Sequence, residues 1–157
     1  MIKILVIFTL LITVSVILFI VLGHITKSGK PAGMVGGKLL KCPAKPNCVC
    51  SEYRDDTDHY VDPIIISHNT TDDTLKILKE SIQELGGVIQ TDISPYLAAT
   101  FSSSVFGFVD DFEIRIDSIQ NVIHIRSASR VGYSDLGVNK KRTELIKDLF
   151  FKKAKNG

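Results

Sequence analysis

The sequence contains no tryptophan and no internal repeat, and neither sign of charge dominates it. Its formal net charge of +2 is too small to indicate a nucleic-acid-binding protein. Charged residues make up 23% of the chain, close to the globular average, which argues against wholesale disorder. The sequence also lacks a metal-ligand triad, a nucleophile elbow and a phosphate-binding glycine loop. We therefore expect no metal and no cofactor, and the motifs assign no reaction.

One long hydrophobic run lies near the N-terminus. Residues 4–22 are apolar except for two threonines and a serine, whose hydroxyl groups can bond to the backbone of their own helix. At about 1.5 Å per residue the run is about 28 Å long, which matches the hydrocarbon thickness of a bilayer. A buried core helix would be shorter or amphipathic. The sequence therefore predicts a transmembrane anchor over residues 1–25.

A cleaved signal peptide is the main alternative for this segment. Signal peptides usually have an apolar region of about 7–15 residues that ends at a small-x-small cleavage site. Here the run is longer, and the sequence LGHITK at residues 22–27 is a poor site. No cysteine follows the run at the position that lipoproteins use. We expect an uncleaved helix that crosses the membrane once.

The segment after the anchor is rich in glycine, lysine and proline, so residues 26–40 are expected to form a flexible linker before a domain over 41–157. Lys3 precedes the apolar run, whereas four lysines follow it at Lys27, Lys30, Lys38 and Lys41. This distribution favours a cytoplasmic domain. The cysteines favour the opposite side of the membrane.

Three cysteines, Cys42, Cys48 and Cys50, lie close together at the start of the domain. Two prolines stiffen the stretch between Cys42 and Cys48. A disulfide between these two cysteines would close a short loop, and it would require an oxidising compartment. A zinc site would need a fourth ligand, and only the distant His59 is available; reduced structural thiols are the other alternative. We expect the disulfide, with Cys50 free or buried, and a domain outside the cytoplasm, in the periplasm.

The rest of the domain shows alternating strand and helix patterns in the order β-α-β-β-β-β-α. The expected strands cover residues 59–67, 88–92, 96–101, 112–117 and 122–127. The first helix of the domain begins at capping residues 69–73 and ends at Gly86 and Gly87. The last helix carries an apolar stripe formed by Val138, Leu145, Ile146, Leu149 and Phe150. Strands joined by short loops favour an antiparallel sheet. The predicted fold class is α+β, a two-layer sandwich with both helices on one face of a mainly antiparallel sheet.

The register of the last hairpin can be predicted from its strict alternation. If Ile114 faces Ile125 on one side of the sheet, Glu113 faces Arg126 on the other. A slip of one residue would place isoleucines opposite charged side chains. The hairpin is therefore expected to have an apolar face for the core and a charged face for water or a ligand.

Three stretches resemble the signatures of an uncharacterised bacterial and plastid family, DUF1499. They are FGFVDDFE at residues 106–113, RSASRVGYSDLGVN at 126–139, and the N-terminal motif formed by Cys42-Pro43 and Pro46-Asn47-Cys48-Val49. The resemblance covers about residues 41–149. Cys50 stands where the family pattern is expected to have a serine. The family has no established activity, so the resemblance implies a domain boundary and not a function.

A dense group of polar residues falls within these motifs. Its members are Asp110, Asp111, Glu113, Arg126, Ser127, Ser129, Arg130, Tyr133, Asp135, Asn139 and Arg142. The first interpretation is structural: Asp110 and Asp111 accept hydrogen bonds from Arg126 or Arg130, and Ser134 or Asp135 caps the last helix. The chain would then be a purely structural envelope protein.

The second interpretation is a binding module. Arg126, Arg130 and Arg142 would converge on a carboxylate or phosphate, and the helix start after Asp135 would add backbone donors. The partner would be a small anionic molecule, a lipid headgroup or a protein. The lysines of the last helix could also rest on anionic lipid, although a solvated helix face explains them as well.

The third interpretation is a hydrolase-like enzyme in which Asp110 and Asp111 perform acid–base chemistry. Neighbouring strand residues point to opposite faces, so these two carboxylates would share a site only at a bulge or in a loop. We favour the binding or interaction module, anchored in the membrane.

Overall fold

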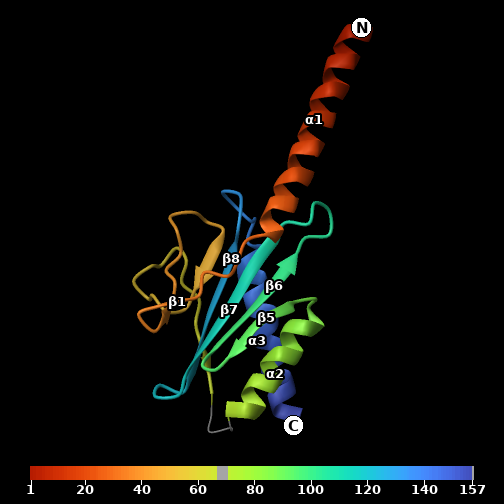
Figure 1. Cartoon of the computed structure of the whole chain (residues 1–157). Helices are drawn as coiled ribbons and strands as arrows, with labels where there is room; N and C mark the ends of the chain where they lie inside the picture. Colours follow the sequence, from red (N-terminus) through yellow and green to blue (C-terminus); the bar gives the residue numbers. More distant parts are fainter. Residues whose placement is uncertain (67–70, 157) are drawn as a thin grey trace.

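A computed structural model describes residues 1–66 and 71–156 of the chain (Figure 1). A long helix, α1 (Ile2–Lys27), projects from one end of a domain that contains a sheet and two further helices. The C-terminus lies at the end of the domain that is farthest from α1. Asn69 and Thr70, which were expected to cap the second helix, lie outside the described residues.

The described part of the chain forms one six-stranded sheet and one small hairpin. The sheet contains β3 (Cys48–Cys50), β4 (Ile64–Ile65), β5 (Val88–Ile93), β6 (Tyr96–Ser102), β7 (Val109–Asp117) and β8 (Val122–Ser129). Its order is β3-β8-β7-β6-β5, with β4 also paired to β8, and all of these pairs are antiparallel. The hairpin joins β1 (Met34–Val35) to β2 (Lys38–Leu39). The predicted α+β fold with a mainly antiparallel sheet is confirmed.

The register of the β7–β8 hairpin is the one that the alternation predicts. Ile114 pairs with Ile125, and Glu113 pairs with Arg126. The predicted first strand covered residues 59–67, and within the described part of that range, residues 59–66, the strand is limited to Ile64 and Ile65. The sequence analysis missed β3, a three-residue edge strand too short to show a period.

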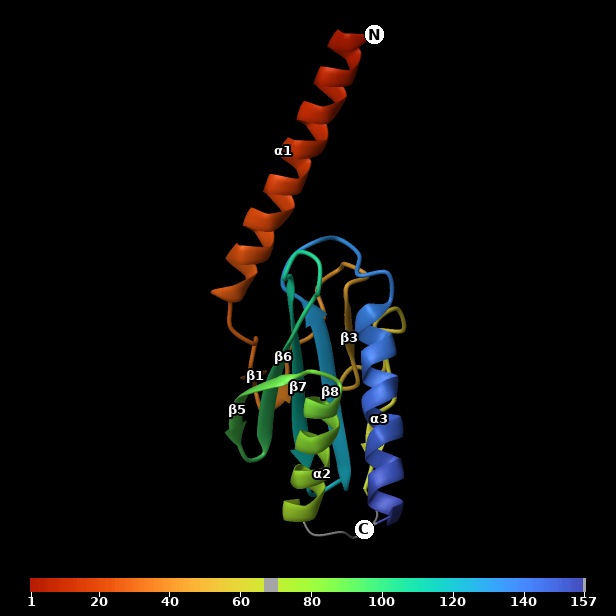
Figure 2. The same ribbon diagram turned by 90° about the vertical axis from the view of Figure 1, so that its right-hand side faces the viewer.

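Helices α2 (Thr71–Glu84) and α3 (Val138–Asn156) both cover the apolar face of the sheet (Figure 2). Gly86, at φ 83°, ends the first of them in a left-handed conformation. The core contains Leu78 and Ile82 of α2, Ile146 and Phe150 of α3, and the inward side chains of β6, β7 and β8. Each fully buried side chain of this size stabilises the fold by roughly 1.5–3 kcal/mol. This packing confirms the predicted two layers.

The opposite face of the sheet is also covered, which corrects one expectation. The prediction left the charged face open to water, but Glu113 is 0% exposed and Arg126 only 6% exposed. A second apolar cluster, built from Leu39, Ala128 and the cysteines with Tyr53 and Tyr96, lies on this side. The covering segment between α1 and β4 is mostly irregular, so its sequence carries no period that would have revealed this packing.

Residues 26–40 contact the sheet and do not form a free tether. Thr26 is 2% exposed and Leu39 is 0% exposed. The backbone N–H of Gly33 donates a hydrogen bond of 2.7 Å to Oε1 of Glu113. Composition alone predicted flexibility here because the residues that hold this segment are distant in sequence. The predicted flexible linker is therefore tied to the domain.

The predicted disulfide between Cys42 and Cys48 is present, with the two Cα atoms 5.7 Å apart. Because these sulfur atoms are bonded to each other, they do not act as zinc ligands. Cys50 is a free cysteine and is 2% exposed. Burial raises the pKa of its thiol from 9.0 to about 11, so it stays protonated near neutral pH.

Candidate functional site

The polar group predicted from the sequence is divided between the two faces of the sheet. Strand side chains alternate, so neighbours along β7 and β8 point in opposite directions. The face that carries α2 and α3 receives Asp110, Ser127 and Ser129, which meet Asn139 and Arg142 of α3. The other face receives Asp111, Glu113 and Arg126, with Arg130 just beyond β8.

On the helix side the polar residues satisfy one another. Arg142 donates from Nη2 to Oδ2 of Asp110 at 2.7 Å and from Nη1 to Oδ1 of Asn139 at 2.6 Å. Ser127 donates to the same Asn139 oxygen at 2.6 Å. Asn139 is 1% exposed, and its Nδ2 donates to the carbonyl oxygen of Asn47. This network holds α3 on the sheet, and it pairs Asp110 with Arg142 where Arg126 or Arg130 was expected.

At the start of α3, the carboxylate of Asp135 already accepts hydrogen bonds from backbone N–H groups that an anion would otherwise bind. Its Oδ2 accepts the N–H of Asn139 at 2.7 Å, and its Oδ1 accepts the N–H of Gly137 at 3.0 Å. Tyr133 lies in the same loop with 70% of its surface exposed. The predicted cap is therefore present, and it replaces the predicted anion site at the helix start.

Asp110 and Asp111 point to opposite faces of the sheet, so the structure does not bring the two carboxylates together. Asp110 is bound by Arg142, and Asp111 is bound by Arg130 at 2.6 Å. The same geometry separates Arg142 from the other two arginines, so the three predicted arginines do not converge on one ligand. A two-carboxylate hydrolase site is therefore absent from this position.

On the other face, Glu113 and Arg126 form a buried ion pair. Nη1 of Arg126 donates to Oε2 of Glu113 at 2.6 Å, and the hydroxyl group of Tyr96 donates to Oε1 at 2.7 Å. Burial, together with this hydrogen bond to a carboxylate, raises the pKa of Tyr96 far above its usual range. Tyr96 therefore stays neutral and serves as a donor. Glu113 is fully occupied by its neighbours.

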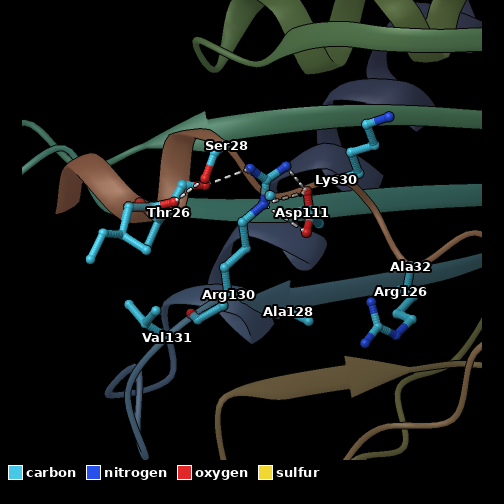
Figure 3. Close-up of a pocket in the computed structure, with 12 residues that line it drawn as sticks. Thr26, Ser28, Lys30, Ala32, Asp111, Arg126, Ala128, Arg130 and Val131 are labelled. Carbon is cyan, nitrogen blue, oxygen red and sulfur yellow. Dashed lines mark hydrogen bonds and ion pairs between the residues drawn. The ribbon is translucent and has the colours of Figure 1, made fainter. Parts of the chain in front are cut away.

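Arg130 joins the end of α1 to the sheet. Its Nε and Nη2 donate to the carboxylate of Asp111, and its Nη1 donates to the carbonyl oxygen of Thr26 at 2.6 Å (Figure 3). The hydroxyl oxygen of Thr26 accepts the N–H of Val109 at 3.1 Å. Cations are favoured at helix C-termini, where carbonyl groups lack helical partners.

A cavity of about 480 Å³ lies between the end of α1 and the sheet. Six residues at and after the end of α1 form part of its wall: Ile25, Thr26, Ser28, Gly29, Lys30 and Ala32. Strands β7 and β8 and the segment just after β8 contribute Asp111, Arg126 and residues 128–131. Figure 3 shows the Arg130 guanidinium group between Thr26 and Asp111, and that of Arg126 apart from it, near Ala32. The cavity therefore combines a membrane-length helix with the charged face of the sheet.

Arg126 is the unsatisfied group of this cavity. A guanidinium group carries five N–H donors, and among the described residues the hydrogen bond of Arg126 is the one from Nη1 to Glu113. Its Nε is buried, and residues 1–66 and 71–156 provide no hydrogen-bond partner for it. Three cationic residues, Lys30, Arg126 and Arg130, line the cavity beside one acid, Asp111. The arrangement suits a carboxylate or phosphate group.

A second polar cluster was missed by the sequence analysis. Ser51 Oγ lies 3.3 Å from Nδ1 of His124, and Nε2 of His124 lies 3.8 Å from Oε2 of Glu52. These residue types also form hydrolase triads. Here, however, Arg115 binds Glu52 at 2.6 Å, and Ser51 is 3% exposed and accepts the N–H of Ile125. The cluster is a buried structural network.

Part of this cluster could have been found from the alternation. Arg115 and His124 face each other across the hairpin, as its predicted register requires. Burial lowers the pKa of His124, so the ring stays neutral near pH 7. Ser51 and Glu52 come from an irregular segment, which has no pattern that would place them.

These features define a class of protein: a small α+β domain behind one helix that is long and apolar enough to cross a membrane. Residues 38–150 match the model of a family described as "Protein of unknown function (DUF1499)". The match covers more than half of the chain, so the chain belongs to this family. A comparison with curated proteins finds no match. The family assignment confirms the resemblance seen in the sequence and assigns no activity.

Proposed function

We propose that this chain is a single-pass membrane protein whose domain binds an anionic group in the cavity beside Arg126. The ligand class is a phosphate or carboxylate. We place the domain outside the cytoplasm. The proposal rests on one observation: a buried guanidinium group with an unpartnered Nε lines a cavity at the end of a membrane-length helix.

The properties of α1 support the membrane anchor. The helix has 26 residues, and the most apolar window within it is 0% buried by the rest of the structure. Side chains such as Leu5, Ile12 and Ile17 are about half exposed or more. Exposure of so much apolar surface to water would be strongly unfavourable, whereas lipid would cover it. Thr9, Thr13 and Ser15 each donate to a helix carbonyl four residues earlier, as lipid requires.

The electrostatics of the cavity support an anionic ligand. Arg130 is already neutralised by Asp111, and Arg126 is paired with Glu113. Lys30 then supplies a net positive charge, and the remaining donors of Arg126 supply hydrogen bonds. Guanidinium groups bind carboxylates and phosphates through such charge-assisted bonds.

The position of the cavity along the chain supports a ligand site at the boundary between the bilayer and water. The apolar run ends at residue 22, and the cavity wall begins at Ile25. A phosphate held there would lie at the depth of lipid headgroups. The same chemistry could come from a lipid of the surrounding leaflet or from a free anion, and the test below separates these sources.

The disulfide supports a domain outside the cytoplasm. Structural disulfides persist in oxidising compartments and are rare in reducing ones. The lysines that follow α1 oppose this orientation under the positive-inside rule. Of these, Lys41 lies beside Asp55 and Asp56, at 3.8 and 4.0 Å, so part of the positive charge is offset locally.

The test uses the full chain in a nonionic detergent and isothermal titration calorimetry. The probes are dihexanoyl phosphatidic acid, dihexanoyl phosphatidylcholine, inorganic phosphate and, as the carboxylate, acetate. Binding of phosphatidic acid alone would identify a lipid headgroup, and equal binding of inorganic phosphate would identify a free anion. Absence of binding by every probe would overturn the proposal.

The variant Arg126→Lys keeps a cation beside Glu113 but removes the guanidinium fork. We expect it to weaken binding by about tenfold or more, because a hydrogen bond to a charged group contributes roughly 1.5–3 kcal/mol. Lys152→Gln is the matched control, since Lys152 is exposed and lies in the last turns of α3. The C-terminal end of this helix is at the end of the domain farthest from α1 (Figure 1). Equal binding by Arg126→Lys and the original chain would show that Arg126 is not the site.

A further inference from the structure

We propose that the loop between β6 and β7, residues 103–108, inserts into the same bilayer as α1. The domain would then hold the membrane at two points. This inference rests on the proposed membrane role of α1 and is independent of the anion site. Figure 1 shows this loop beside the end of α1, whereas the β7–β8 turn lies at the opposite end of the domain.

The tip of the loop is unusually apolar for a hairpin connection. Val105 is 78% exposed, and the neighbouring Phe106 and Phe108 are half-buried. Turns that face water are normally polar and rich in Gly, Asn, Asp or Pro. Three large apolar side chains at such a tip are favourable only where something other than water covers them.

The contact of these side chains with α1 indicates that the bilayer around α1 covers them. The ring of Phe19 lies 5.2 Å from the ring of Phe106 and 6.3 Å from that of Phe108. Phe19 stands three residues before the end of the apolar run at residue 22, which is about 4–5 Å along the helix axis. If α1 spans a bilayer, the loop therefore reaches the edge of the hydrocarbon, where aromatic rings are favoured.

The contact between the loop and α1 is close enough to require glycine. A Cβ atom at Gly23 would lie 1.9 Å from the carbonyl oxygen of Phe106, so any other residue would push the two apart. Just beyond, the buried hydroxyl oxygen of Thr26 accepts the N–H of Val109, where the loop ends. The loop cannot leave α1 without breaking these contacts, so both must lie at the same depth.

Part of the loop backbone is hydrogen-bonded within the loop itself. The N–H of Ser103 donates to the carbonyl oxygen of Phe108, and the N–H of Gly107 donates to that of Ser103. The N–H of Phe108 is bound by the side chain of Ser103. Non-helical backbone at membrane depth is tolerated only where its polar groups find such partners.

The absence of tryptophan from the chain makes a fluorescence test direct. The single-tryptophan variant Val105→Trp reports on the loop, and Ile119→Trp is its matched control, since Ile119 is 94% exposed at the tip of the β7–β8 turn. A third variant, Phe8→Trp, reports on α1. Each full-length variant is placed in phosphatidylcholine vesicles with and without brominated acyl chains.

We expect the emission of Val105→Trp and Phe8→Trp to shift to shorter wavelength and to be quenched by brominated lipid. Ile119→Trp should show neither effect. Quenching of Phe8→Trp without quenching of Val105→Trp would overturn the loop inference and leave the anchor intact. Lack of quenching in Phe8→Trp would overturn the anchor and this inference together.

A further variant tests the glycine contact. Adding Gly23→Val to Val105→Trp should reduce the quenching of the loop reporter, because the new side chain collides with the backbone of Phe106. The same substitution in Phe8→Trp should leave the quenching of α1 unchanged. Unchanged quenching of both reporters would show that the loop reaches the lipid without this contact, contrary to the mechanism proposed here.

Discussion

Arg130 and Thr26 are 104 residues apart in the sequence, and Nη1 of the arginine donates a 2.6 Å hydrogen bond to the carbonyl oxygen of the threonine. The same guanidinium group holds Asp111 of β7. One side chain therefore connects the membrane-length helix to the central strand of the sheet. This connection gives α1 a defined direction relative to the domain, and the cavity lies beside it.

Arg130→Gln should destabilise the domain by about 3 kcal/mol, because Asp111 would remain as a largely buried and unpaired charge. The free energy of unfolding of the full chain in detergent is measured by urea titration. Lys79→Gln is the control, since the pair of Lys79 with Asp92 is exposed and should contribute less than about 1 kcal/mol. Equal effects of the two substitutions would contradict the role of Arg130.

The buried pair of Glu113 and Arg126 should behave asymmetrically under mutation. Glu113→Leu alone should cost about 3–5 kcal/mol, because it leaves a buried arginine without its counter-ion. The double variant Glu113→Leu, Arg126→Met should recover part of that loss, because it removes the unpaired charge but leaves Tyr96 and the N–H of Gly33 without their acceptor. Urea unfolding of both variants provides the measurement. A double variant less stable than Glu113→Leu would show that Arg126 stabilises the fold without its counter-ion, contrary to this expectation.

Cys50 should be unreactive in the folded protein. Its thiol is 2% exposed and its pKa is raised to about 11, so the reactive thiolate is scarce at pH 8. We expect N-ethylmaleimide to leave the native, non-reduced chain unmodified and to add one label after unfolding in urea, as detected by mass spectrometry. Rapid labelling of the native chain at pH 8 would contradict this environment for Cys50.

His124 should make the fold sensitive to mild acid. Burial holds its pKa below the ordinary value of 6.5, so between the two pKa values the unfolded chain binds more protons than the folded one. Stability should therefore fall as the pH is lowered through 6.5 and be fully reduced below the folded pKa. His124→Gln should flatten this part of the profile, measured as the free energy of unfolding between pH 7.5 and pH 5 by urea titration.

His59 provides the control, because its effect on the pH dependence of stability should have the opposite sign. Burial lowers its pKa, but hydrogen bonds to Asp56 and to the carbonyl oxygen of Lys45 outweigh that effect and raise it overall. Its contribution is therefore complete below pH 6.5 and is lost as the pH rises through the folded pKa. His59→Asn should remove stability mainly on the acid side. Parallel profiles for the two variants would contradict these assignments.

The elements that the sequence predicted correctly are those that carry a period or a fixed local spacing. The alternation in β7 and β8 determined which residues face the helices, because a slip of one residue would bury charges among isoleucines. The short, proline-stiffened loop between Cys42 and Cys48 predicted their disulfide. The unbroken apolar run predicted a helix of membrane length at the N-terminus.

Only the tertiary structure decided what covers the charged face of the sheet. The segment between α1 and β4 has no period, yet it buries Glu113 and supplies Glu52 as the partner of Arg115. The carbonyl group of Thr26, at the end of α1, is likewise bound by Arg130. Each of these contacts joins residues far apart in the chain, and local preference carries no information about such distances. The cavity beside Arg126 exists for the same reason, because its walls come from segments far apart in the sequence that meet only when the chain folds.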